Sequence, residues 1–158
     1  MKSVIIYYSY SGNTRKVAEI LAGYLAEKYE TQTLELKPLD ESKNFFIQGG
    51  RAYKHIKAQL DNVNFDLSAY DLVCLGTPVW AFTSTPAINA YAHNCVGLEN
   101  KTVILFTTSG GIGDKRCLDY LQAILSKKGV GIFKRFSIRH HEVKQKDLVL
   151  SKIKQALA

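Results

Sequence analysis

Three short apolar runs constrain the fold of this chain more than any other feature of its sequence. They are Val4–Tyr8, Leu72–Leu75 and Val103–Phe106. Continuous apolar runs of this length are typical of strands that are buried on both faces, as in a parallel sheet. The sequence therefore predicts a parallel sheet whose two faces are both covered.

Two further candidate strands and three helical patterns complete the expected set of elements. Residues 32–37 and 132–138 alternate polar and apolar side chains, which predicts partly exposed edge strands. Between the strands, apolar side chains recur at helical spacing within 17–25, 118–125 and 148–157. The pattern of residues 38–70 is weaker, and we expect a short helix there over 51–60.

Strands that alternate with helices predict right-handed βαβ units and a doubly wound α/β sheet of three layers. If the three apolar strands are central and the two alternating strands are edges, the order of the five parallel strands is 2-1-3-4-5. We expect residues 1–158 to form one domain. Ligands of such sheets bind outside the carboxyl ends of the strands, between the first and third strands.

The loop after the first strand has the composition of a phosphate cradle. Its hydroxyl, amide and glycine residues directly precede a helix, whose first N–H groups are free to bind an anion. An ordinary helix cap without ligand is the alternative interpretation. Neither GxxxxGK[ST] nor GxGxxG is present, which disfavours nucleoside triphosphate hydrolysis. The candidate residues are Ser9, Tyr10, Ser11, Gly12, Asn13 and Thr14.

Two other loops follow the third and fourth strands. The first of them carries Trp80, whose ring could bind a flat ligand by stacking. The second is rich in glycine and could expose backbone N–H and C=O groups to the polar edge of a ligand. The candidate residues are Thr77, Pro78, Val79, Trp80 and Ala81 in one loop, and Thr108, Ser109, Gly110 and Gly111 in the other.

Together, the three loops resemble the FMN-binding loops of flavodoxins. Residues Ser9 to Thr14 match the pattern Ser/Thr-x-Ser/Thr-Gly-Asn-Thr, and the run Gly76 to Trp80 resembles the loop that places an aromatic ring against the isoalloxazine. The resemblance implies a flavodoxin-like fold with one non-covalent FMN. The chain departs from the family pattern at Ala81, where many flavodoxins have glycine, and in its third loop, which lacks a tyrosine.

The resemblance implies a redox protein, and we expect an electron-transfer carrier. A small FMN-dependent NAD(P)H or quinone reductase is the alternative, because an open outer flavin face would admit a substrate. The side chains that could cover that face are Tyr10, Phe45, Phe46 and Tyr53. A receiver domain for phosphoryl groups is disfavoured, because no acidic residues follow the first strand to hold Mg²⁺.

The net charge of +7 resides in the last part of the chain. Residues 127–158 contain nine Lys and Arg against two Asp and Glu. We expect a redox partner protein, a reductase or an acceptor. The basic end could favour an acidic partner protein or an anionic membrane surface. A solvated helix face with a charged edge strand is the alternative interpretation. Nucleic-acid binding is disfavoured, because aromatic side chains are nearly absent among these basic residues. The oligomeric state, monomer or homodimer, is left open.

Neither a membrane span nor a metal site is expected. No apolar stretch approaches the roughly 20 residues that a spanning helix needs, and we expect a soluble, cytoplasmic protein. Cys74, Cys95 and Cys117 are widely spaced and form no CxxC pair, so we expect packing thiols. His140 and His141 are expected on the basic edge strand, where adjacent side chains point to opposite faces, and they lack a third ligand.

The phosphate cradle can be tested by replacing both Ser11 and Thr14 with alanine. We expect this double variant to lose far more affinity for FMN than for riboflavin, because only FMN carries the phosphate. Quenching of flavin fluorescence measures both affinities. Equal losses for the two flavins would contradict the cradle.

Overall fold

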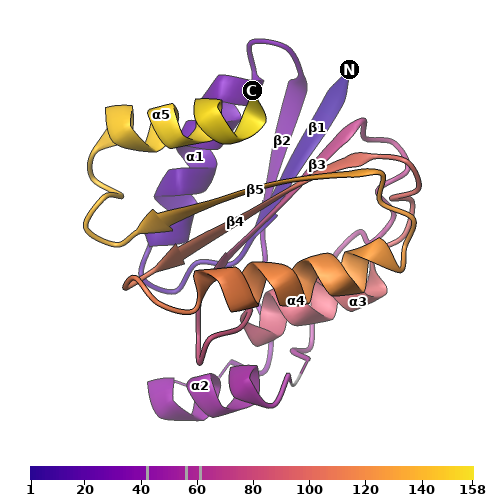
Figure 1. The fold of residues 1–158 in the computed structure, drawn as a ribbon. Helices are drawn as coiled ribbons and strands as arrows, with labels where there is room; N and C mark the ends of the chain where they lie inside the picture. Colours follow the sequence, from indigo (N-terminus) through magenta and orange to yellow (C-terminus); the bar gives the residue numbers. More distant parts are fainter. Residues whose placement is uncertain (42, 56, 61) are drawn as a thin grey trace.

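The computed structural model describes residues 1–41, 43–55, 57–60 and 62–158 and confirms the predicted sheet (Figure 1). Its strands are all parallel, and their order among the described residues is β2-β1-β3-β4-β5. This is the flavodoxin-like α/β arrangement. The strands are β1 (Lys2–Tyr7), β2 (Glu30–Glu35), β3 (Leu72–Pro78), β4 (Thr102–Ser109) and β5 (Ile132–Arg139).

Helices cover both faces of the sheet, as the apolar runs require. In Figure 1, α1 and α5 lie on one face and α3 and α4 on the other, while α2 lies outside the sheet and contacts α3. The helices are α1 (Asn13–Leu25), α2 (Phe45–Tyr53), α3 (Pro86–Asn94), α4 (Asp114–Ser126) and α5 (Lys146–Leu157).

The central strands divide their side chains between two cores. Ile6 and Tyr8 pack into the core on the α3 and α4 side, whereas Ile5 and Tyr7 pack into the core on the α1 and α5 side. All four are buried. The predicted burial on both faces is confirmed, and β2 and β5 are the partly exposed edges that their alternation indicated.

The ends of several strands differ from the prediction. β3 continues through Pro78 and β4 through Ser109, because Thr77 still pairs with Thr107 and Pro78 with Thr108. Thr108 and Ser109, which were expected in a loop, are therefore the last residues of a strand. β2 begins at Glu30 and ends at Glu35, two residues before the predicted range in each case.

Two helices show where the sequence patterns fell short. The helix expected over 51–60 instead spans Phe45–Tyr53 and contains Gly49 and Gly50. The side chain of Asn44 fixes its start by accepting a hydrogen bond from the N–H of Phe46 at 2.9 Å. Helix α3 was not predicted, because its first seven residues are all buried and leave no polar stripe.

The cysteines are packing thiols, as predicted. Cys74, Cys95 and Cys117 are buried and unpaired. Burial raises the pKa of each thiol, to about 11 for Cys95 and further for the other two. They therefore stay protonated at neutral pH. No helix among the described residues has the length and apolar character needed to cross a membrane.

Close packing at the middle of the sheet depends on Gly76. A Cβ atom added there would lie 2.1 Å from Cζ of Phe106, whose ring stacks on Phe136 with centroids 5.4 Å apart. Both phenylalanines are buried. The strand can therefore pass this ring only if residue 76 has no side chain.

We expect Gly76→Ala to lower the free energy of unfolding by about 2–3 kcal/mol, because the ring of Phe106 must leave its packed position. The same substitution at Gly23, an exposed position in α1 where nothing lies within 4 Å of an added Cβ, should instead raise it by about 0.5–1 kcal/mol. Urea unfolding of both variants measures the difference. Equal effects would show that Phe106 does not restrict this position.

Candidate functional site

The three candidate loops leave neighbouring strands at one edge of the sheet. The N–H of Tyr8 donates to the carbonyl of Gly76 at 3.2 Å, so β1 remains paired with β3 where the first loop begins. In the same way, the N–H of Val79 donates to the carbonyl of Thr108 at 2.9 Å. The sheet therefore brings the loops after β1, β3 and β4 together at its carboxyl edge (Figure 1).

The start of α1 fits an anion. The N-cap residue of α1 is Gly12, whose φ is 93°. No side-chain hydrogen bond caps the helix at this residue. The first turn contains no acidic residue. Within the described ranges, the backbone N–H groups of Ser11, Gly12, Asn13 and Thr14 have no protein acceptor. Donors of this kind at a helix start bind phosphate groups well.

The start of α4 differs, because it already holds its own anion. Asp114 lies in the first turn of α4 and accepts hydrogen bonds from the hydroxyls of Thr107 and Ser109, both at 2.7 Å. The Ser109 hydroxyl also accepts from the N–H of Gly111 at 3.0 Å. Of these two helix starts, only that of α1 is left open to an external anion.

Arg15 is held away from the helix start by an ion pair. Its guanidinium lies 2.6 Å from Oε1 of Glu35 on β2, and this contact holds the pKa of that carboxyl below its ordinary value. Burial raises the pKa of Tyr7, whose hydroxyl donates to the same carboxylate at 3.3 Å. Ser9 caps the next position, since its Oγ accepts from the N–H of Arg15 at 3.2 Å.

Several predicted ligand hydroxyls are engaged inside the protein. Thr14 and Thr108 are buried and share a hydrogen bond of 2.8 Å, which ties the first loop to β4. The hydroxyl of Thr77 donates to the carbonyl of Pro78 at 2.8 Å and accepts from the N–H of Thr85. These side chains hold the loops in place.

The loop after β3 folds into a tight turn with unusual residues. The N–H and C=O groups of Trp80 and Thr83 bond each other reciprocally at 3.0 Å, so Ala81 and Phe82 are the two central residues. Their φ angles are 48° and 63°. Both lie in the left-handed region, which Asn and Gly normally occupy in such turns. The turn is therefore strained at the position where many flavodoxins have glycine.

Trp80 is more buried than a tryptophan that stacks on a ligand at the protein surface would be. Its side chain is 6% exposed, and its ring makes edge contacts with Tyr8 and Tyr10 at centroid distances of 5.6 and 5.5 Å. Tyr10 is 50% exposed and Phe82 45%, so these rings reach solvent beside Trp80. Stacking of Trp80 on a flavin remains a prediction.

The predicted site residues differ in exposure. Tyr10, Ser11 and Gly110 are exposed, and Ser9, Gly12, Asn13, Val79, Ala81 and Gly111 are partly exposed. Thr14, Thr77, Pro78, Trp80, Thr108 and Ser109 are buried. Among the candidates for covering the outer flavin face, Phe46 and Tyr53 are exposed on α2, and the side chain of Phe45 lies outside the described part.

Sequence reasoning left out three residues of this edge. Asp114 organises the third loop, and Phe82 shares the strained turn with Ala81. His55 lies next to that turn, with Nδ1 3.4 Å from the Thr83 hydroxyl and its ring stacked on Tyr120 at 4.1 Å. An acidic residue at a predicted helix start could have indicated the role of Asp114. No local signal indicated His55.

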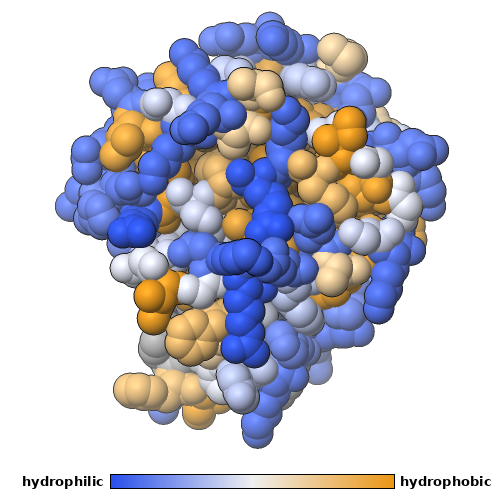
Figure 2. Space-filling model, viewed as in Figure 1, coloured by the Kyte–Doolittle hydropathy of each residue, from blue (hydrophilic) through white to orange (hydrophobic). Residues whose placement is uncertain are grey.

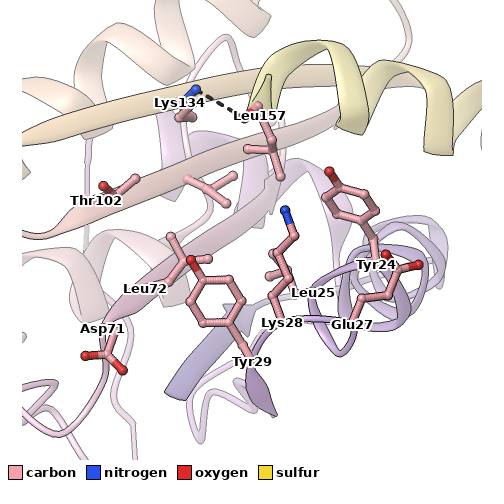
Figure 3. A pocket seen from close by; sticks show the side chains of 11 residues that line it. Tyr24, Leu25, Glu27, Lys28, Tyr29, Asp71, Leu72, Thr102, Lys134 and Leu157 are labelled. Carbon is pink, nitrogen blue, oxygen red and sulfur yellow. Dashed lines mark hydrogen bonds between the residues drawn. The ribbon is translucent and has the colours of Figure 1, made fainter. Parts of the chain in front are cut away.

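The cavity of about 230 Å³ in Figure 3 lies at the opposite edge of the sheet. Leu72 and Thr102, which begin β3 and β4, line it together with Tyr24 and Lys28. Lys134 also lines it and donates to the carbonyls of Leu157 and Ala158. This cavity is therefore separate from the three loops.

The histidine pair lies outside the strand in which it was expected. β5 ends at Arg139, and His140 and His141 occupy the turn that follows. In the part of the chain that the structure describes, no three His, Cys, Asp or Glu side chains are grouped to hold a metal ion.

A sequence model of the flavodoxin family matches residues 50–147, which is more than half of the chain. The chain belongs to the flavodoxin family. The match includes the loops after β3 and β4 and begins after the loop that follows β1. The position of that first loop therefore rests on the structure, which places it beside the two loops that the family model includes.

Solved structures support the flavodoxin fold. A candidate flavoprotein from Bacteroides uniformis superposes with a TM-score of 0.75 at 22% identity, over 97% of each chain. A flavoprotein in complex with FMN from Lactobacillus acidophilus has a TM-score of 0.60 at 23% identity, over 92% of this chain and 98% of that one.

An NADH:FMN oxidoreductase in its apo form has a TM-score of 0.67 at 16% identity, over 99% of this chain and 86% of that one. At these identities the likenesses show the fold alone. A search of curated protein sequences finds no match.

The positive φ of Ala81 leads to a prediction about the stability of the protein. We expect Ala81→Gly to raise the free energy of unfolding by about 0.5–1 kcal/mol, because glycine adopts a positive φ without the steric cost that alanine bears. The same substitution at Ala123, an exposed position inside α4, should lower it by about 1 kcal/mol. Urea unfolding checks both signs, and a loss of stability in Ala81→Gly would contradict the strain.

Proposed function

We propose that the chain binds one FMN without a covalent bond and acts as an electron-transfer carrier. The observation that carries this proposal is the open start of α1, at the carboxyl edge of a flavodoxin-family sheet, where four neighbouring N–H groups have no acceptor among the described residues. A phosphate ester has the charge and acceptor oxygens that such a helix start binds. The membership of the family supports FMN as the molecule that supplies it.

The residues at the three loops fit this cofactor. The hydroxyl of Ser11 and the amide of Asn13 can add donors to the N–H groups that hold the phosphate. The exposed backbone of Gly110 and the partly exposed backbone of Gly111 can bind the polar edge of the isoalloxazine, and Tyr10 offers a ring beside them. When bound, FMN supplies one- and two-electron redox chemistry, and the protein tunes it by contact and solvent exclusion.

The side chains of the loops favour a carrier. Carriers need a bound, positioned cofactor, whereas an enzyme that protonates its substrate also needs an acid within reach. At the third loop, the carboxylate of Asp114 already accepts hydrogen bonds from Thr107 and Ser109. We also propose one domain over residues 1–158 and a reducing, cytoplasmic location, which the three unpaired cysteines support.

A reductase is the second candidate, and His55 is the observation that favours it. This exposed imidazole lies beside Thr83 in the strained turn and is stacked on Tyr120. Histidine is the side chain best suited to deliver a proton near neutral pH. A quinone that accepts two electrons at an open flavin face also needs protons, and His55 could deliver one of them.

Binding of FMN is tested by titrating the apoprotein with FMN and with riboflavin. We expect stoichiometric quenching of FMN fluorescence and at least about 100-fold weaker binding of riboflavin, because two or more charge-assisted hydrogen bonds are lost without the phosphate. Asn13→Ala should weaken FMN binding, and Asn94→Ala, at the exposed end of α3, should leave it unchanged. Equal affinity for the two flavins would contradict the cradle.

The carrier and the reductase are separated by mixing the FMN-loaded protein with NADH or NADPH in the absence of any reductase. A carrier should oxidise neither nucleotide at a catalytic rate. Rapid oxidation with a quinone as acceptor, slowed by His55→Gln and unchanged in His141→Gln, would establish the reductase and overturn the carrier.

A further inference from the structure

Seven exposed Lys and Arg side chains lie along the carboxyl edge of the sheet. They come from the first turn of α1, the first turn of α4 and the segment 139–146 that joins β5 to α5. We call them the basic collar. They are Arg15, Lys16, Lys115, Arg116, Arg139, Lys144 and Lys146, and each is exposed.

The carboxylates of the same segments offset only part of this charge. Those segments contain Asp114 and Glu142, and both are partly buried. Asp114 holds two hydroxyls of β4, as described above. Glu142 accepts from the ammonium of Lys152 with both oxygens at 2.7 Å and from the N–H of Arg139 at 2.8 Å. The charge presented outward by these segments is therefore positive.

Most of the collar is also outside the ion pairs of the described chain. Arg15 is paired with Glu35, and Lys115 with Asp119. The other five collar residues form no ion pair with any described residue. Asp147, in the first turn of α5, is an exposed carboxylate next to Lys146. It reduces the local charge by one and leaves the collar strongly positive.

The position of the collar strengthens its field. Lys16 and Arg116 lie in the first turns of α1 and α4, where the helix dipole is itself positive. At α1, which has no acidic residue in its first turn, the two contributions add, whereas at α4 the carboxylate of Asp114 offsets the dipole. The resulting potential is centred on the edge from which the three loops emerge, and it attracts anionic partners to that edge.

Apolar side chains at the loop tips lie within this charged surface. Ile112 is 71% exposed between Gly111 and Gly113, and Tyr10 and Phe82 are about half exposed. Phe46 and Ile47 extend the apolar area along α2. Figure 2 shows hydrophilic side chains over the left of the molecule and apolar ones below them. Apolar anchors surrounded by charge are typical of a protein interface, with the charge guiding the encounter.

We propose that the basic collar and these loop tips form the docking surface for a small acidic electron-transfer protein, and this proposal rests on the proposed function. Charge complementarity selects the occupant: a positive surface with apolar tips fits an acidic protein that has apolar contacts of its own. Because the proposed FMN site lies at the same edge, a protein docked there would be close enough to exchange electrons with the flavin.

The test uses the FMN-loaded protein and a reduced acidic ferredoxin as the probe. Stopped-flow absorbance measures the second-order rate constant for flavin reduction. One variant combines Arg116→Glu, Lys144→Glu and Lys146→Glu. Its matched control combines Lys2→Glu, Lys28→Glu and Lys127→Glu, which make the same change in net charge with exposed residues at the opposite edge.

We expect the collar variant to react at least about 10-fold more slowly than the wild type at low ionic strength, and the control to stay within about 3-fold. The wild-type rate should fall as ionic strength rises from about 0.01 M to about 1 M, because the screening length shrinks from about 30 Å to about 3 Å. Equal slowing of both variants, or a wild-type rate independent of salt, would overturn the docking surface.

A second measurement does not need the flavin. In ¹⁵N NMR spectra of the flavin-free and FMN-loaded protein, oxidised ferredoxin should perturb residues 13–16, 114–117 and 139–146. Perturbation there without FMN binding would support the docking surface and contradict the proposed function. No perturbation, or perturbation elsewhere, would overturn the docking surface whatever the flavin does.

A nucleotide is the main alternative occupant. If charge reversal in the collar raised the KM for NADPH and left the ferredoxin rate unchanged, the positive surface would belong to a dinucleotide site, and the protein-docking proposal would be wrong.

Discussion

The rest of the structure depends on the parallel hydrogen-bond ladder of β1, β3 and β4. Its pairing continues to the last residues of the strands, where Thr77 lies opposite Thr107 and Pro78 opposite Thr108. Because the three strands are parallel neighbours, their loops leave the sheet at the same edge. Beside this ladder, Gly76 leaves the space that the ring of Phe106 occupies.

At that edge, two helix starts with similar geometry have different electrostatic roles. Both α1 and α4 begin after a glycine with positive φ. Asp114 supplies an internal anion to α4 and fixes the third loop, whereas α1 has no acidic residue in its first turn and leaves its N–H groups to an external anion. This asymmetry gives the edge one helix start that is open to an anion and one organised loop. The basic collar then extends the positive charge from the site to the surface around it.

Much of the fold followed from local patterns. Apolar runs identified the three central strands, alternation identified the two edges, and their combination gave the strand order. Helix α3 was missed, because complete burial removes the polar stripe that a pattern needs. The predicted ends of β3 and β4 came too early in the sequence. Threonine and serine are common in loops, so the pattern predicted a loop where the structure pairs these residues in the sheet. The role of Asp114 was missed for the same reason, since its partners Thr107 and Ser109 were assigned to a loop.

The sequence by itself determined the class of fold, the sheet edge at which the three candidate loops lie and the glycine and hydroxyl composition of the first loop, because these depend on residue type and short-range order. Only the tertiary structure decided which of the polar groups remain open. It joined Thr14 to Thr108, placed Trp80 between Tyr8 and Tyr10 in the core, and brought His55 to the turn at Thr83. It also gathered basic residues from three distant segments into one collar. These outcomes depend on contacts between residues far apart in the chain, which no local pattern encodes.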